Sequence, residues 1–357
     1  MTKISLSMIV KNEEDVLKRC LDSAAGFADE IVVVDTGSTD ATADIARTFT
    51  DKVYSYKWND DFAAARNYSF SLASGDFVMW LDADDVVRES EAAKINAWKG
   101  SPDADTLYCL YDAAFDEAGR PTFTFYRERI LRRCPLAVWN GFIHECIRPF
   151  GKVVKSDIRI EHRPLPGKHK APDRNLNIYR ANIMRGAKLD ARDRFYYGRE
   201  LIYNGFIEEG VYMIESMLSA KDAFYINQIE GLKTIAEAKL KQGDASGAKK
   251  AYLRSFEYGA PRAWALNGLG RIARAGNDLG EAVLWFKAAM EAADHTAEGE
   301  FERKEERTVI PYIELCRCYW EAGRRDDAAR MHAAAKAAAP FDPYVRYNDR
   351  FFGGGGE

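Results

Sequence analysis

Two carboxylates close together after a hydrophobic run are the first residues that suggest chemistry. Asp82 and Asp84 follow the apolar run 77–81, with one alanine between them and a third acid, Asp85, directly after. Two carboxylates at this spacing can reach one ligand from a turn, and such hard oxygen ligands suit Mg²⁺ or Mn²⁺. A metal of this kind usually bridges phosphate oxygens. We therefore predict a metal and phosphate site here, with an acidic surface turn as the alternative.

The elements around these acids alternate between strand and helix patterns. Strands are predicted at 5–10, 30–35, 53–56 and 77–81, and helices at 13–24, 41–49 and 61–73. This order predicts an open, mostly parallel α/β sheet with helices on both faces. In such sheets, ligands bind beyond the carboxyl ends of the strands. The polar segments 10–12, 35–37 and 82–84 all follow strand ends, so we expect them to meet at one edge.

The second half of the chain, from about residue 168, is predicted to be helical throughout. Helix-ending glycines recur at spacings of 38, 33 and 47 residues, namely Gly205, Gly243, Gly276 and Gly323. Tetratricopeptide repeats have a period of about 34 residues and the same helix–turn–helix pattern. We predict three to four degenerate repeats, with an insertion around 298–307 and a plain helical bundle as the alternative. The predicted domains are 1–165 (catalytic), 166–190 (a basic helical connector), 191–350 (repeats) and 351–357 (a flexible Gly-rich tail).

Composition and charge exclude several classes of protein. The 357 residues are 47% hydrophobic and 30% charged, with a formal net charge of −4, which excludes a disordered, collagen-like or disulfide-scaffold chain. Near-neutrality argues against a general nucleic-acid binder. We find neither an apolar run approaching the ~20 residues of a membrane span nor a signal-peptide layout, so we expect a cytoplasmic protein without membrane contacts. Locally, residues 168–199 hold nine basic and three acidic residues, which marks this stretch as a candidate acceptor-binding region or a solvated helix face.

The motifs at the strand ends fit neither of two common nucleotide-binding classes. The sequence lacks both the Gly-rich dinucleotide fingerprint and the Walker A lysine loop. Asp35 nevertheless ends a strand before a Gly-containing turn, where a carboxylate can bind a base or ribose. Taken together, residues 5–85 resemble the nucleotide-binding half of family 2 glycosyltransferases, which have the GT-A fold. The segments that carry the resemblance are 7–14, 30–40, 65–67 and 80–85, followed by 129–132 and 139–145.

The resemblance extends to about residue 165 and implies roles for the matching positions. A subgroup of these enzymes carries C-terminal tetratricopeptide repeats, which the second half resembles. On the donor side, the resemblance implies that Val10 and Asn12 border the nucleobase and that Asp35 binds uracil or ribose. It also implies that Arg66 lies near the base or diphosphate and that Asp82 holds the ribose or a metal-bound water. On the metal side, it implies that Asp84 ligates Mn²⁺ or Mg²⁺, and that Asp82 and His162 complete the metal site.

A second acidic motif supplies candidates for the catalytic base. Inverting transfer is an in-line displacement in which a side chain takes the proton of the acceptor. The resemblance implies that an acid after the Asp-x-Asp motif does this, and Glu145 fills that place, although the usual aspartate version of the motif is absent. His144 is an alternative base or the group that orients Glu145. Arginine matches phosphate bidentately, so one of Arg129, Arg132 and Arg133 is expected to bind the diphosphate, and Arg132 is the first candidate; the alternative is that all three are surface charges.

These observations predict a metal-dependent, inverting glycosyltransferase that uses a nucleotide sugar, with a UDP-sugar as the expected donor. The repeat region offers a concave helical surface suited to an extended peptide or to self-association. A peptide or protein acceptor is therefore favoured over a glycan, with a modified nucleic acid third, and a homo-oligomer through the repeats is a further expectation. The alternatives are a nucleotidyltransferase, which needs a basic Gly-rich loop after the first strand, and a non-catalytic repeat scaffold. The acidic loop 11–14 argues against the first, and the retained candidate residues argue against the second.

Overall fold

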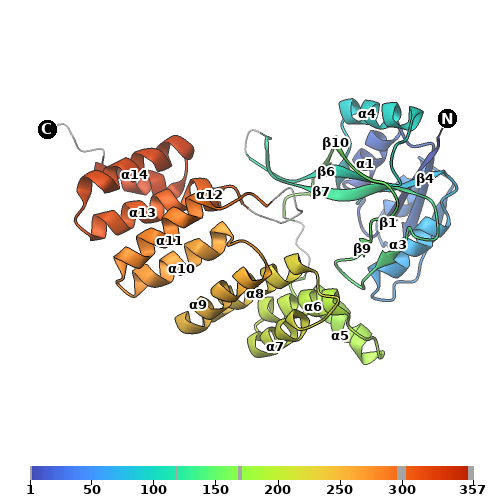
Figure 1. The fold of residues 1–357 in the computed structure, drawn as a ribbon. Coiled ribbons are helices and arrows are strands. Elements are labelled where there is room, and N and C mark those ends of the chain that lie inside the picture. The colour runs from blue at the N-terminus through green and yellow to red at the C-terminus, as the bar shows by residue number, and fades with distance from the viewer. Residues whose placement is uncertain (1, 117–118, 168–170, 296–302, 353–357) are drawn as a thin grey trace. The chain divides into compact units, whose positions relative to one another are not determined.

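The chain forms two compact units, Met1–Lys188 and Leu189–Glu357. The computed structural model describes residues 2–116, 119–167, 171–295 and 303–352. Figure 1 draws the first unit in blue to green and the second in yellow-green to red. The predicted connector and insertion each fall partly outside the described residues, as does most of the predicted Gly-rich tail. The two units are described separately below.

The first unit is built on one mixed sheet of eight described strands, in the order β3-β2-β1-β4-β7-β6-β10-β5. The strands are β1 Ile4–Val10, β2 Glu30–Asp35, β3 Val53–Ser55, β4 Phe77–Trp80, β5 Asp85–Val86, β6 Thr106–Phe115, β7 Pro121–Arg132 and β10 Val153–His162. A separate two-stranded ribbon pairs β8 Trp139–Asn140 with β9 Cys146–Ile147. The predicted α/β fold is therefore confirmed.

Strand direction changes in the middle of this sheet. β1 runs parallel to β2 and β4, and β2 runs parallel to β3. β7 is antiparallel to β6, because the short connection between these two strands can only make a hairpin. On its other side, β7 is also antiparallel to β4. β10 returns parallel to β6, and β5 closes the sheet antiparallel to β10. The carboxyl ends of β1, β2 and β4 therefore share one edge, whereas the carboxyl end of β7 lies at the opposite edge.

Helices cover both faces of the sheet. They are α1 Leu17–Ala24, α2 Thr42–Arg47, α3 Phe62–Ser71 and α4 Glu89–Gly100, whereas α5 Arg174–Met184 bonds to the loop before α3. The main core packs α1, α2 and α4 against one face, where Leu6, Val33 and Met79 are fully buried. A smaller core packs α3 and the β8–β9 ribbon against the other face, around Trp80 and Trp139. The alternation of Met79 and Trp80 to opposite faces explains why β4 is apolar throughout.

The second unit consists of helical hairpins. Its described helices are α6 Ala191–Tyr203, α7 Ile207–Leu218, α8 Tyr225–Lys241, α9 Ala245–Arg254, η1 Ser255–Tyr258 (a 3₁₀ turn), α10 Ala263–Ala275, α11 Leu279–Glu291, α12 Glu305–Thr308, α13 Ile310–Glu321, α14 Arg325–Ala338 and α15 Pro343–Phe352. Short turns join α6 to α7, α8 to α9, α10 to α11 and α13 to α14, as in tetratricopeptide repeats. The predicted repeat architecture is confirmed. None of the helices in the described ranges is both long and apolar enough to cross a membrane.

The turns of these hairpins show why the glycine pattern was informative. Gly205, Gly243 and Gly323 adopt positive φ angles of 88°, 79° and 73°, which side chains other than glycine rarely accept. In the remaining turn Gly276 has an ordinary helical φ, and Asn277 takes the left-handed position at φ 63°. Asparagine tolerates this region better than most residues. The turn between α10 and α11 therefore resembles the other three, with asparagine instead of glycine at the position of positive φ.

Helices α6 and α7 approach each other so closely that a methyl group does not fit between them. A Cβ at Gly210 would lie 2.6 Å from the carbonyl oxygen of Gly198 and 3.0 Å from the amide nitrogen of Ile202. We expect Gly210→Ala to lower the free energy of unfolding by ~1–3 kcal/mol, because backbone atoms must move apart. Gly280→Ala is the matched control, since its Cβ would have ordinary contacts in an exposed helix. Urea denaturation curves that are equal for the two variants would contradict the expected crowding.

Candidate active site

The loops after β1 and β2 are joined into one structure at the carboxyl edge of the sheet. Val10 and Asp35 lie side by side in the strand register. The amide oxygen of Asn12 accepts a hydrogen bond from the backbone N–H of Thr39 at 2.8 Å, and the Asn12 N–H donates to the Ser38 hydroxyl at 3.0 Å. Asp35 Oδ1 in turn accepts from the Ser38 N–H and hydroxyl at 2.9 and 2.7 Å. The predicted base-binding residues Val10, Asn12 and Asp35 are thus brought together.

Arg66 connects the predicted catalytic acid to the predicted donor site. It lies on α3, whose N-terminus is capped by Asp61, and its side chain is 9% exposed. Its Nε donates to Glu145 Oε1 at 2.7 Å, and its Nη2 donates to Asp82 Oδ1 at 2.8 Å. The guanidinium also lies over the rings of Trp80 and Trp139. Two charge-assisted hydrogen bonds and the contacts with two indole rings leave this planar group little freedom, so Arg66 fixes the positions of the two carboxylates.

The segment that carries Glu145 is held by α3. Asn67 makes a pair of hydrogen bonds with the backbone of Trp139, at 3.0 and 2.8 Å. The N–H of Phe62 donates to the carbonyl of Phe142 at 2.8 Å. Between β8 and β9, His144 adopts a positive φ of 56°, which turns the chain directly before Glu145. These contacts bring residues 139–145 next to the start of α3, which carries residues 65–67.

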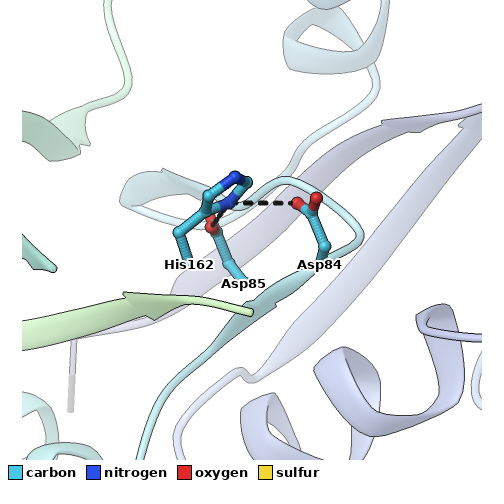
Figure 2. Close-up of side chains that lie close together, drawn as sticks. All are labelled: Asp84, Asp85 and His162. Atoms are coloured by element: carbon cyan, nitrogen blue, oxygen red, sulfur yellow. Dashed lines mark ion pairs between the residues drawn. The ribbon is translucent and has the colours of Figure 1, made fainter. Parts of the chain in front are cut away.

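His162 and two aspartates form a second cluster, shown in Figure 2. His162 ends β10 and pairs with Asp85 of β5, which places its ring beside the turn 82–85. Its Nδ1 lies 3.4 Å from Asp84 Oδ1 and 3.5 Å from Asp85 Oδ1. One ligand atom from each of Asp84, Asp85 and His162 falls within 4.8 Å of the others. The cluster brings His162 to Asp84 as predicted, but its third member is Asp85, whereas Asp82 has an oxygen committed to Arg66.

The cluster offers donors that suit a divalent cation. His162 Nδ1 is buried and forms no hydrogen bond with a described residue, and Asp84 is partly exposed. Asp85 is fully buried and already engaged: Oδ1 accepts from the Tyr111 hydroxyl at 2.9 Å and Oδ2 from Arg129 at 2.9 Å. The Asp84 carboxylate and the His162 imidazole therefore fit Mn²⁺ or Mg²⁺ as ligands. Asp85 lies beside His162 and helps to fix the position of its ring.

The charges around the turn shift two pKa values in opposite directions. Burial opposes the ionised form of Asp82, but Arg66 and Arg129 outweigh burial and hold the pKa of Asp82 well below its ordinary value. For His162, burial disfavours the charged ring, but the carboxylates of Asp84 and Asp85 raise its pKa from 6.5 to about 9. Without a metal, the ring is therefore a cation at neutral pH and partly neutralises the acidic cluster.

This raised pKa predicts a specific dependence of stability on pH. Because the folded pKa exceeds the ordinary 6.5, protonated His162 stabilises the chelator-treated protein fully below pH 6.5, and this stabilisation is lost as pH rises through about 9. We expect the difference in unfolding free energy between the wild type and His162→Gln to shrink over that interval. Urea denaturation at a series of pH values measures this difference, and a constant difference would rule out the ion-pair explanation.

Arg132 does not lie with the other predicted site residues. Because β7 is antiparallel to β4, Arg132 pairs with Phe77 at the start of β4, at the edge opposite Asp82. Its guanidinium bonds to Asp105 and stacks on the Phe77 ring. The arginine of this group that reaches the site is Arg129, which binds Asp85 and lies 3.7 Å from the Trp80 ring centroid. A sequence pattern gives no signal for this choice, since strand direction decides it.

Comparisons with known proteins agree with the two-part organisation. The model of the family described as glycosyl transferase family 2 matches residues 5–150. A TPR repeat-containing protein of Synechococcus elongatus is 26% identical over 298 residues, covering 82% of this chain and 66% of that protein. The SPbeta prophage-derived glycosyltransferase SunS of Bacillus subtilis is 28% identical over 210 residues, covering 56% of this chain and 49% of that protein.

Among solved structures, S. aureus TarS 1–349 aligns with a TM-score of 0.38 and 14% identity, covering 84% of this chain and 93% of that one. The chain spans 66% and 49% of the lengths of the Synechococcus and Bacillus relatives named above. The family match ends at residue 150, and the described helices of the second unit form tetratricopeptide-like hairpins. Residues 5–150 are therefore a glycosyl transferase family 2 domain, followed by a helical repeat region.

Proposed function

We propose that this chain is an inverting glycosyltransferase that moves a sugar from a nucleotide-sugar donor, a UDP-sugar, to a side chain of a peptide or protein. The observation that carries the proposal is the connected set Glu145–Arg66–Asp82 next to Asp84 and His162. This set supports the proposal because a carboxylate that could accept a proton lies near side chains that could bind a cation, at the edge where α/β sheets bind ligands. The membership of residues 5–150 in the glycosyltransferase family supports the same reaction class.

In this proposal Glu145 takes the proton of the acceptor. Its Oε1 is held by Arg66, which leaves Oε2 to accept the proton. Arg66 orients this carboxylate and keeps Asp82 ionised, so that Asp82 can hold a ribose hydroxyl or a water. Asp35, Val10 and Asn12 bind the nucleoside at the ends of β1 and β2. Mn²⁺ or Mg²⁺ on Asp84 and His162 would offset the negative charge of the leaving diphosphate.

Donor binding and donor hydrolysis test the proposal without knowledge of the acceptor. The protein is incubated with a panel of nucleotide sugars that differ in base and sugar, with Mn²⁺, Mg²⁺ or a chelator. We expect one donor to raise the melting temperature and to be hydrolysed slowly in the presence of metal. Asp84→Asn is expected to remove the metal-dependent part of both signals, while the matched variant Asp22→Asn, at an exposed position of α1, retains them. If no donor responds under any metal condition, the transferase proposal is wrong.

A further inference from the structure

Helix α5 brings an arginine to the candidate active site from outside the segment matched by the family model. The helix packs on the loop before α3: Asn182 donates to the carbonyl of Asp60 at 2.6 Å, and Arg185 donates to the Asp60 carboxylate at 2.6 Å. At the other end of α5, the Arg174 guanidinium lies 4.8 Å from the ring centroid of Phe62. Phe62 is the residue whose N–H holds Phe142, three positions before Glu145.

The charge of Arg174 has no close counter-ion in the part of the chain that the structure describes. Among the described residues, no carboxylate lies within ion-pair distance of its guanidinium, whereas Arg185 on the same helix is paired with Asp60. Glu145 is near enough to favour the charged form of Arg174, but the Oε1 of Glu145 is already bound by Arg66. Burial nevertheless dominates and lowers the pKa of Arg174 below its ordinary value. A half-buried cation without a partner is costly, and an anion that binds there removes that cost.

The side of Glu145 on which Arg174 lies indicates which substrate would bring that anion. In the proposed reaction the donor phosphates bind near Asp84, in the turn after β4, and His162, at the end of β10. Arg174 instead shares its surroundings with Phe62 and Glu145, where the acceptor loses its proton in the proposed reaction. We propose that Arg174 is a specificity-determining residue that binds an anionic group, a phosphate or a carboxylate, next to the reacting atom of the acceptor.

This inference rests on the proposed function, and its consequence is a preference for acidic acceptors. A charge-assisted hydrogen bond contributes ~1.5–3 kcal/mol, so Arg174→Gln is expected to raise the acceptor KM by ~10–150-fold. Arg174→Lys keeps the charge but loses the planar fork, so an intermediate KM is expected.

Chemical labelling tests the anion site with simple probes. Phenylglyoxal modifies accessible arginines, and mass spectrometry of the digested, chelator-treated protein gives the modification rate of each one. The probes are inorganic phosphate and acetate, each compared with chloride at equal ionic strength. We expect phosphate to slow modification of Arg174 severalfold and to leave Arg47, an exposed arginine of α2, unchanged. Slowing by acetate as well extends the site to carboxylates, and slowing by phosphate alone restricts it to phosphate.

Two outcomes would overturn the inference. One is an Arg174 modification rate that neither anion changes, and the other is equal slowing at Arg174 and Arg47, which would be a general salt effect. The donor-hydrolysis assay separates these results from a failure of the proposed function. If the wild type hydrolyses a donor but Arg174 is not protected, the transferase proposal stands and only the acceptor inference is wrong.

Discussion

Replacement of Glu145 by glutamine is expected to lower the rate of donor hydrolysis and transfer by ~10²–10⁴-fold while donor affinity stays near the wild-type value. The amide keeps an oxygen that can accept the hydrogen bond from Arg66 Nε, so the packing of Arg66 against Trp80 and Trp139 is preserved. What the amide cannot do is take a proton. Steady-state hydrolysis of the donor and calorimetric titration with the donor measure the two quantities separately.

The neighbouring histidine provides the contrast for this experiment. His144 has a positive φ of 56°, a conformation that asparagine accepts, so His144→Asn removes the imidazole with little backbone strain. If Glu145 is the base, His144→Asn should retain most of the hydrolytic rate. A rate lost in His144→Asn and kept in Glu145→Gln would assign the proton transfer to the histidine instead.

Replacement of Arg129 by methionine is expected to lower the free energy of unfolding by ~3–5 kcal/mol. The side chains of Arg129 and Asp85 are 1% and 0% exposed, and their ion pair is 2.9 Å long. Methionine fills much of the space over the Trp80 and Tyr111 rings but leaves the Asp85 carboxylate buried without its cation. Chemical denaturation followed by circular dichroism measures the loss.

A double variant identifies the source of that loss. In Arg129→Met with Asp85→Asn, the buried charge is gone, and the amide can still bond to the Tyr111 hydroxyl. We expect this double variant to be more stable than Arg129→Met alone. A double variant that is less stable by the sum of the two single losses would mean that packing, rather than the unpaired charge, determines the cost.

The first half of the sheet could be predicted from sequence because its signals are local. β2 and β4 each contain an unbroken apolar run that leads to an aspartate, β1 is apolar apart from two serines, and parallel strands place the ends of all three at one edge. Asp35 and Asp82 were therefore identifiable as candidates before any coordinates. The glycine turns of the repeats are local signals of the same kind, since a positive φ requires glycine or a close substitute.

The rest of the site depends on pairings between distant residues. Asp85 meets His162 because the two-residue strand β5 joins β10, and a strand that short has no sequence signature. Asp82 is turned toward Arg66, sixteen positions earlier, rather than toward the histidine. The donor role predicted for Arg132 requires it to lie at the carboxyl edge of β4, whereas the antiparallel direction of β7 carries it to the opposite edge.

The attachment of α5 also bears on where this chain can be shortened. The family match stops at residue 150, and the sequence predicted a domain border at 165, yet Asn182 and Arg185 hold the loop before α3. A truncated protein that ends at either border would expose Phe62 and loosen the helix that carries Arg66. The compact unit instead extends to Lys188. We propose that residues 1–188 are the shortest fragment that folds as the catalytic unit. In this fragment α5 is a required part of the unit, and the helical repeats are the part that can be removed.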